Sequence, residues 1–160
     1  MKCFGLIGNP LGHSFSPLIH KHLFGIKNID ASYKLLETTP ENLKKRIDEL
    51  KSGEYDGFNV TIPYKIEIMK YLDEISPEAL AIGSVNTICM KNGKVVGYNT
   101  DYFGFKRELE YYNIKVEKQN AYVLGTGGAS KAITKALENM NANVTLVSRH
   151  PKNNIIGYED

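Results

Sequence analysis

The sequence predicts an α/β fold in which short buried strands alternate with helices. Apolar runs of strand type at residues 3–8, 31–36 and 58–62 each precede a segment with helical periodicity. Asn92-Gly93 separates two further apolar runs and is the strongest short signal for a β-hairpin. Finally, a glycine-rich turn at residues 125–128 connects a strand-type run to a helical one, as in a β-α-β unit.

Composition and length limit the class of protein. The chain has 160 residues, 42% hydrophobic and 24% charged, which is ordinary for a soluble globular protein and allows one domain plus part of a second. A net charge of +2 with scattered lysines and arginines argues against nucleic acid as a partner. No apolar run approaches the ~20 residues of a membrane span, and no signal peptide opens the chain, so we expect a cytoplasmic protein and no membrane partner.

Cysteines and histidines indicate neither disulfides nor metal binding. Cys3 and Cys89 have no Cys-x-x-Cys partner, so we expect two reduced, partly buried thiols. His13, His20 and His22 lack the i, i+4 spacing of a helical metal site, and we therefore expect no metal ion.

The first strand, residues 3–8, leads into a loop that carries Ser14 and Ser16. Pro17 fits the first position of a helix and Ser16 fits its N-cap. Two hydroxyls beside a helix start can converge on a carboxylate. The alternative is that Ser16 only caps the helix and Ser14 is ordinary loop.

A second strand, residues 31–36, precedes a helix that starts at Thr39-Pro40. The apolar stripe of this helix is Leu43, Ile47 and Leu50, with charged residues on the solvated side.

The strand at residues 58–62 contains Thr61 and breaks at Pro63, after which Lys65 opens the next helix. A lysine at a helix N-terminus lies at the unfavourable end of the macrodipole. The charge of Lys65 is therefore either exposed to solvent or stabilised by a carboxylate, in which case its proton can be used in chemistry.

A short helix from Ser76-Pro77 ends at Gly83, and strands at residues 84–90 and 94–98 form the hairpin. Asn86 projects from the first of these strands among apolar neighbours. A buried amide needs partners, so Asn86 is either a structural hydrogen bonder or a ligand for substrate hydroxyls.

A helix over residues 102–112 follows, with Phe105, Leu109 and Tyr112 on one face. Thr100 and Asp101 lie directly before it. A plain helix cap is the simplest role for Asp101.

The glycine-rich turn favours a nucleotide phosphate. It lies between a strand at 121–124 and a helix at 131–140, whose apolar face is Ala132, Ile133, Ala136, Leu137 and Met140. Gly125 permits a tight turn, Gly127 lets a pyrophosphate approach the backbone, and the helix N-terminus presents free N–H groups. Ser130 replaces the third glycine of the commonest fingerprint, and an ordinary strand-to-helix turn is the alternative.

The next strand, residues 143–147, ends in Ser148-Arg149 without the carboxylate that would hold the ribose hydroxyls of NAD. A cation and a hydroxyl suit the additional 2′-phosphate of NADP, so the sequence favours NADP.

Five motifs in this order resemble the shikimate dehydrogenase family. They are Gly8-Asn-Pro-Leu-Gly-His-Ser-Phe-Ser-Pro17, Asn59-Val-Thr-Ile-Pro-Tyr-Lys65, Gly83-Ser-Val-Asn-Thr87, Gly97-Tyr-Asn-Thr-Asp101 and Gly125-Thr-Gly-Gly-Ala129. The resemblance implies an N-terminal three-layer α/β substrate domain with a mixed sheet (residues 1–101), a connecting helix and turn (102–118), and a partial Rossmann-like NADP-binding domain (119–160).

The resemblance also implies a reversible NADP-linked reduction of 3-dehydroshikimate to shikimate, in the route to aromatic amino acids. Ser14 and Ser16 would hold the substrate carboxylate. The ring hydroxyls would be held by Thr61, Lys65, Asn86 and Asp101. Lys65 and Asp101 would form the catalytic pair. The cofactor would be held by Gly125, Thr126, Gly127, Gly128, Ala129, Ser148 and Arg149.

The chain departs from the family pattern in three places. Family members often have histidine where Tyr64 stands, and Asn-Arg-Thr where this chain has Ser148-Arg149-His150. After residue 147 we expect only a polar tail, residues 153–160, and hence a nucleotide-binding part of two strands. Such a sheet has unpaired edges, so we expect a piece of a longer protein or a short form that pairs as a homodimer. Two alternatives to the dehydrogenase are a non-catalytic shikimate-binding module and a quinate/shikimate dehydrogenase.

Overall fold

The computed structural model describes residues 1–159 and divides them into two compact units. The first unit consists of residues 1–80 and 85–98, and the second of residues 81–84 and 99–159. None of the helices in the described part of the chain combines the length and apolar character that a transmembrane span requires. The α/β class predicted from the sequence is confirmed.

The first unit contains one six-stranded mixed sheet in the order β2-β1-β3-β5-β6-β4. Its strands are β1 (Lys2–Gly8), β2 (Ala31–Glu37), β3 (Gly57–Val60), β4 (Glu74–Ile75), β5 (Thr87–Lys91) and β6 (Lys94–Tyr98). β1 pairs in parallel with β2 and β3, whereas β3–β5 and β5–β6 are antiparallel. The short strand β4, which the sequence pattern did not predict, adds to β6 in parallel.

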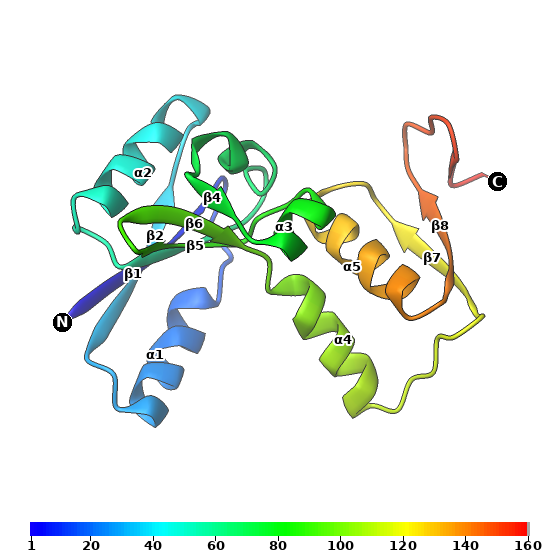
Figure 1. Cartoon of the computed structure of the whole chain (residues 1–160), viewed down its shortest axis with the longest axis horizontal. Coiled ribbons are helices and arrows are strands. Elements are labelled where there is room, and N and C mark those ends of the chain that lie inside the picture. The colour runs from blue at the N-terminus through cyan, green and yellow to red at the C-terminus, as the bar shows by residue number, and fades with distance from the viewer. Residues whose placement is uncertain (160) are drawn as a thin grey trace. The chain divides into compact units, whose positions relative to one another are not determined.

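Helices cover both faces of this sheet, which makes the three layers (Figure 1). They are α1 (Ser16–Lys27), the 3-10 turn η1 (Pro40–Asn42), α2 (Leu43–Lys51), the 3-10 helix η2 (Glu67–Tyr71) and α3 (Pro77–Ile82). α1 and α2 lie on opposite faces. Gly83 directly follows α3, and its φ of +68° suits a residue without a side chain.

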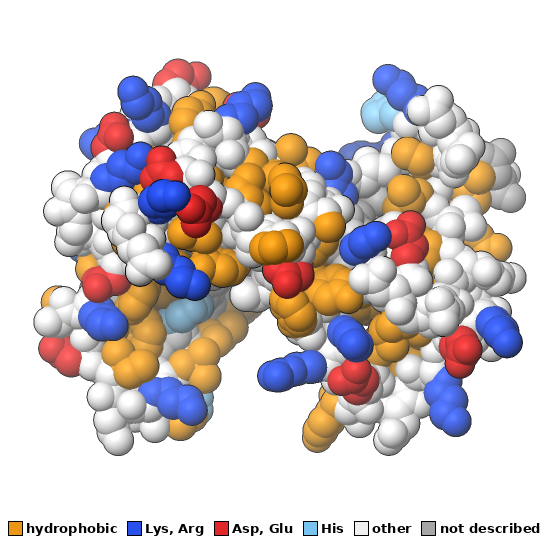
Figure 2. Space-filling model, in the orientation of Figure 1, with side chains coloured by type: hydrophobic (Ala, Val, Ile, Leu, Met, Phe, Trp, Pro, Cys, Tyr) orange, Lys and Arg blue, Asp and Glu red, His pale blue; other side chains and the backbone are white. Residues whose placement is uncertain are grey.

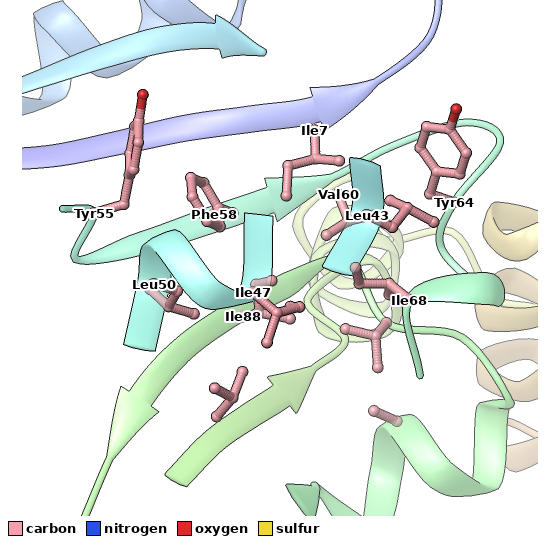
Figure 3. Close-up of a cluster of buried hydrophobic side chains, with 13 residues drawn as sticks. Ile7, Leu43, Ile47, Leu50, Tyr55, Phe58, Val60, Tyr64, Ile68 and Ile88 are labelled. Atoms are coloured by element: carbon pink, nitrogen blue, oxygen red, sulfur yellow. The ribbon is translucent and has the colours of Figure 1, made fainter. Parts of the chain in front are cut away.

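The core of the first unit lies between the sheet and α2. The predicted stripe of Leu43, Ile47 and Leu50 is buried and packs against strand residues such as Ile7 and Ile88 (Figure 3). By contrast, α1 buries no residue completely. Hydrophobic side chains therefore gather on the surface over α1 (Figure 2); they are Leu18, Ile19, Leu23 and Ile26.

The second unit contains a three-stranded parallel sheet in the order β7-β8-β9. Its elements are α4 (Asp101–Tyr111), β7 (Asn120–Leu124), α5 (Gly128–Asn139), β8 (Asn143–Val147) and β9 (Ile155–Ile156). Five residues were predicted to form the apolar face of α5. Three of them are buried, namely Ala132, Ala136 and Leu137. The other two, Ile133 and Met140, are partly buried and pack against the core of this unit.

The prediction of a polar tail after two strands is wrong. Ile155 and Ile156 pair with Leu146 and Val147 and form a third strand. Of the residues predicted on one face of the helix over 102–112, Leu109 is buried, whereas Tyr112 lies just past the end of α4 and is 63% exposed.

Candidate functional site

Sheet topology gathers the candidate residues of the first unit at one edge. β1 and β3 are parallel, so the loops that follow them leave from the same edge. β5 is antiparallel to β3, so its first residue lies at that edge too. Ser14 and Ser16 follow β1, Thr61 follows β3, and Asn86 immediately precedes β5.

The serine pair is joined directly. The Ser14 hydroxyl donates to Oγ of Ser16 at 3.1 Å and accepts the Ser16 backbone N–H at 3.2 Å. Ser16 occupies the first position of α1 rather than the N-cap, and no side chain of the N-cap residue Phe15 caps the helix. The prediction of Ser16 as the N-cap is therefore wrong: Ser14 supplies the capping oxygen, one residue further out than the cap position requires.

Hydrogen bonds hold the serine loop against the ends of β3 and β2. The Asn9 N–H donates to the carbonyl of Ile62 at 3.1 Å, and the Leu11 N–H donates to Oε1 of Glu37 at 2.8 Å. Gly8 makes this close approach possible, because a Cβ there would lie 2.5 Å from the methyl group of Thr61.

Thr61 and Lys65 belong to one tight turn. The Tyr64 N–H donates to the carbonyl of Thr61 at 2.9 Å, and the Lys65 carbonyl accepts the Val85 N–H at 2.8 Å. The Tyr64 side chain is 4% exposed and donates its hydroxyl to the carbonyl of Thr38 at 2.5 Å. Tyr64 thus anchors the backbone beside Lys65.

The prediction that Lys65 opens a helix is wrong. Lys65 lies in the turn, and the segment after it is η2, a 3-10 helix of five residues that begins at Glu67. Such a short segment carries little macrodipole, so the helix-terminus argument for Lys65 does not apply. Lys65 is nevertheless half-buried, in the turn that follows β3.

Asn86 is buried at 7% exposure and lies outside β5 by one residue. Its backbone still continues the hydrogen bonding of the sheet, because its N–H donates to the carbonyl of Tyr98 and its carbonyl accepts the N–H of Val60. The Thr87 hydroxyl donates to Oδ1 of Asn86 at 3.0 Å.

Two further polar residues to which the sequence analysis gave no role, Asn59 and Tyr33, extend the hydrogen bonds of Asn86 and Thr87 across the sheet. Asn59 on β3 donates its Nδ2 to the Thr87 hydroxyl at 3.2 Å, and Tyr33 on β2 donates its hydroxyl to Oδ1 of Asn59 at 2.8 Å. A polar residue within an apolar strand, as Asn59 is in residues 57–60, was the signal that could have identified it.

A pocket of about 240 Å³ opens on the α1 face of the sheet next to this network. Tyr33, Asn59 and Thr87 contribute its polar wall. His20 stacks on the Tyr33 ring with centroids 3.9 Å apart and pairs its Nδ1 with the carbonyl of Ser16 at 2.9 Å. Burial raises the pKa of Tyr33 to about 12, and the hydrogen bond with Ser16 opposes part of that rise.

Asp101 belongs to the second unit, where it is the first residue of α4, three positions beyond the end of β6. The plain capping role is filled by another residue: Oδ1 of Asn99 accepts the Tyr102 N–H at 3.3 Å. Asn99 is 2% exposed and its Nδ2 also donates to the carbonyl of Ser84 at 2.9 Å. Asn99 thus fixes the start of α4, and sequence analysis missed it.

The glycine-rich turn of the second unit has the geometry of a phosphate site. β7 and β8 are parallel, so the turn and Ser148-Arg149 leave the sheet at the same edge. Gly125 has a φ of +103°, which side chains rarely tolerate. Gly127 precedes α5 without a side-chain cap, and no atom lies within 4 Å of a Cβ built there. The N–H groups of α5 are therefore accessible to an anion.

The Ser148 and Arg149 side chains differ in their surroundings. The Ser148 hydroxyl accepts the His150 N–H at 3.2 Å and shapes the turn, while Arg149 is exposed. An exposed cation at the end of the second strand fits a nucleotide with a 2′-phosphate. In the described residues both cysteines are unpaired and partly buried, as predicted.

Comparison with known proteins agrees with the five motifs. Residues 6–88, just over half of the chain, match the model of the shikimate dehydrogenase substrate binding domain. The curated shikimate dehydrogenase (NADP(+)) of Clostridium perfringens is 49% identical over 150 residues, which cover 93% of this chain and 55% of that protein. This chain spans about half the length of the curated relatives it matches.

Solved structures give the same result. Shikimate dehydrogenase 1 from Peptoclostridium difficile superposes with a TM-score of 0.92 at 45% identity, covering 99% of this chain and 61% of the other. The shikimate 5-dehydrogenase of Thermus thermophilus was solved in complex with NADP(H) and shikimate. It superposes with a TM-score of 0.88 at 32% identity, covering 98% of this chain and 62% of the other. On the match over residues 6–88 and these likenesses, the chain belongs to the shikimate dehydrogenase family.

Proposed function

We propose that this chain carries the substrate-binding and catalytic residues of an NADP-linked shikimate dehydrogenase, which reduces 3-dehydroshikimate reversibly to shikimate. The observation that supports it most strongly is the collection of Ser14, Ser16, Thr61 and Asn86 at one edge of the mixed sheet. The names of the relatives, shikimate dehydrogenase (NADP(+)), point to the same activity.

The substrate carboxylate is assigned to the serine pair. The two hydroxyls lie 3.1 Å apart, and each has one rotatable proton, so a bound carboxylate can replace the Ser14–Ser16 bond and accept one hydrogen bond from each serine. Thr61 and Asn86 offer a hydroxyl and an amide to the ring hydroxyls, from the ends of neighbouring strands. This set binds a small polyhydroxylated acid.

Lys65 and Asp101 are assigned the proton transfer. During reduction of the ketone, its oxygen becomes negative and must receive a proton, and a lysine ammonium both stabilises that charge and donates the proton. Asp101 is assigned the role of accepting from the substrate hydroxyl. The support for this pair is the match of both residues to the family motifs.

The residues of the second unit are assigned to NADP, which supplies the hydride when bound. The α5 N–H groups, with Gly125, Thr126, Gly127, Gly128 and Ala129, take the pyrophosphate, and Ser148 and Arg149 take the adenosine end. We further propose a cytoplasmic location, where thiols such as Cys3 and Cys89 stay reduced.

The proposal is tested by following NADP⁺ reduction by shikimate at the nicotinamide absorbance, with shikimate binding measured by calorimetry on the same preparation. Lys65→Ala should abolish turnover, while Lys70→Ala, which removes an exposed lysine paired only with Glu67, should not. Equal rates in wild type and Lys65→Ala would contradict the mechanism. Binding of shikimate without turnover by the wild type would instead identify a substrate-binding module.

A further inference from the structure

A series of hydrogen bonds crosses the α1 face of the sheet, from Tyr33 to Asn86. It runs from Tyr33 to Asn59, then to Thr87 and Asn86. All four residues belong to the first unit. Asn59 and Thr87 are direct cross-strand partners of β3 and β5, so their side chains emerge on the same face.

The orientation of the Asn59 amide is fixed by groups that have a single role. Its Nδ2 faces the backbone carbonyl of Asn86 at 3.5 Å, and a carbonyl only accepts. The Oδ1 atom therefore faces Tyr33, whose hydroxyl donates to it at 2.8 Å. With this orientation, Asn59 also donates to the Thr87 hydroxyl oxygen.

The direction of the next bond follows from the number of protons. A threonine hydroxyl has one proton, and the Thr87 oxygen already accepts from Asn59. The Thr87 proton is directed at Oδ1 of Asn86, 3.0 Å away. With Oδ1 held by Thr87, the amide of Asn86 is oriented so that its Nδ2 end is presented as a donor.

We propose that Thr87 is a positioning residue, which sets the amide of Asn86 so that Asn86 donates from Nδ2 to an oxygen of the shikimate ring. This inference rests on the proposed function, in which Asn86 contacts the substrate, and assigns Thr87 a role that acts through Asn86. Without the Thr87 hydroxyl, Oδ1 of Asn86 loses a donor, so the orientation that turns Nδ2 towards the ligand loses one of the hydrogen bonds that favour it.

The first test uses shikimate binding by calorimetry on the full 160-residue chain. Thr87→Val preserves shape but removes the hydroxyl, and should weaken binding by about tenfold. Thr87→Ser restores the hydroxyl and should bind within about threefold of wild type. As a matched control, Thr145→Val removes a hydroxyl from β8 in the second unit and should leave binding unchanged.

A double-mutant cycle separates positioning from a general structural effect. If Thr87 acts through Asn86, Thr87→Val should have no additional effect in an Asn86→Ala background. An equal loss in both backgrounds, or wild-type affinity in Thr87→Val, would overturn the proposal. Thermal midpoints identify unfolding, and Thr87→Ala replaces the valine variant if the latter does not fold.

A second measurement needs no ligand and separates this inference from the proposed function. The side-chain amide signals of Asn86 in a ¹⁵N–¹H spectrum are assigned by their loss in Asn86→Ala. They should shift in Thr87→Val and return in Thr87→Ser. Unshifted signals in Thr87→Val overturn the role of Thr87, whereas shifted signals with no shikimate binding by wild type overturn the substrate assignment alone.

Discussion

The Tyr33 hydroxyl donates a 2.8 Å hydrogen bond to Oδ1 of Asn59, and this bond connects β2 to β3 across β1. Both side chains are partly buried. Tyr33→Phe should therefore lower the free energy of unfolding by about 1 kcal/mol, because the Asn59 oxygen loses its donor in a poorly solvated place. Urea denaturation of the variant measures this change.

The control for this prediction is Tyr111→Phe, which removes the hydroxyl of a side chain that is 80% exposed. It should change stability by less than about 0.5 kcal/mol. Equal effects of the two substitutions would show that the Tyr33–Asn59 bond contributes nothing to stability.

The raised pKa of Tyr33 predicts a loss of stability in alkaline solution. Burial raises this pKa to about 12 in the folded chain, against about 10 when unfolded. Between about pH 10 and pH 12 the unfolded chain has released the Tyr33 phenol proton and the folded chain still holds it. The contribution of Tyr33 to the free energy of unfolding is therefore fully present below about pH 10 and is lost as the pH rises towards 12. The loss is smaller than about 2.7 kcal/mol, since solvent screens a partly exposed group.

Comparison with Tyr33→Phe isolates this residue from the other titrating groups. Wild type should lose stability more steeply than the variant between about pH 10 and 12. Parallel stability curves would mean that Tyr33 titrates alike in the folded and unfolded chains.

Gly8 is predicted to be essential for the close approach of the serine loop to Thr61. A Cβ at Gly8 would lie 2.5 Å from the Thr61 methyl group and 2.7 Å from Leu11. Gly8→Ala should therefore cost about 1–3 kcal/mol in urea unfolding through overpacking, and should weaken shikimate binding by displacing Thr61.

Gly12→Ala is the matched control, because no atom lies within 4 Å of a Cβ at that position in the same loop. Its stability should stay within about 0.5 kcal/mol of wild type. If both variants unfold at the same urea concentration as wild type, the contact at Gly8 relaxes without cost.

Sequence patterns predicted the elements that depend on local regularity. The alternating runs, the Asn92-Gly93 hairpin and the glycine turn before α5 all rest on periodicity or on backbone conformations that few residues adopt. The stripe of α2 was predicted for the same reason. The two-residue strand β9 was missed, because Ile155-Ile156 is too short to show a period.

The site was only partly predictable for a related reason. Ser14, Ser16, Lys65, Asn86 and Asp101 lie in motifs that the sequence displays directly. Tyr33 lies in none of these motifs, and Asn59 and Thr87 lie in them but were given no role. Their connection was not predicted because the bonds of Asn59 to Tyr33 and Thr87 join residues 26 and 28 positions apart in the chain. Which side chains face one another across a sheet follows from strand order and register, and no local pattern specifies these.

Arg149 is predicted to select NADP over NAD. It is exposed at the end of β8, where a 2′-phosphate on the adenosine ribose would meet a cation and no carboxylate. Since a charge-assisted hydrogen bond contributes about 1.5–3 kcal/mol, Arg149→Gln should weaken NADP⁺ binding by about tenfold to a hundredfold and leave NAD⁺ binding unchanged, as measured by calorimetry.

Lys152→Gln removes a nearby exposed charge and should lower NADP⁺ affinity only slightly, in a salt-dependent way. An equal loss of NADP⁺ and NAD⁺ affinity in Arg149→Gln would assign the arginine to the shared part of the two cofactors, and cofactor selection would then have to come from another residue.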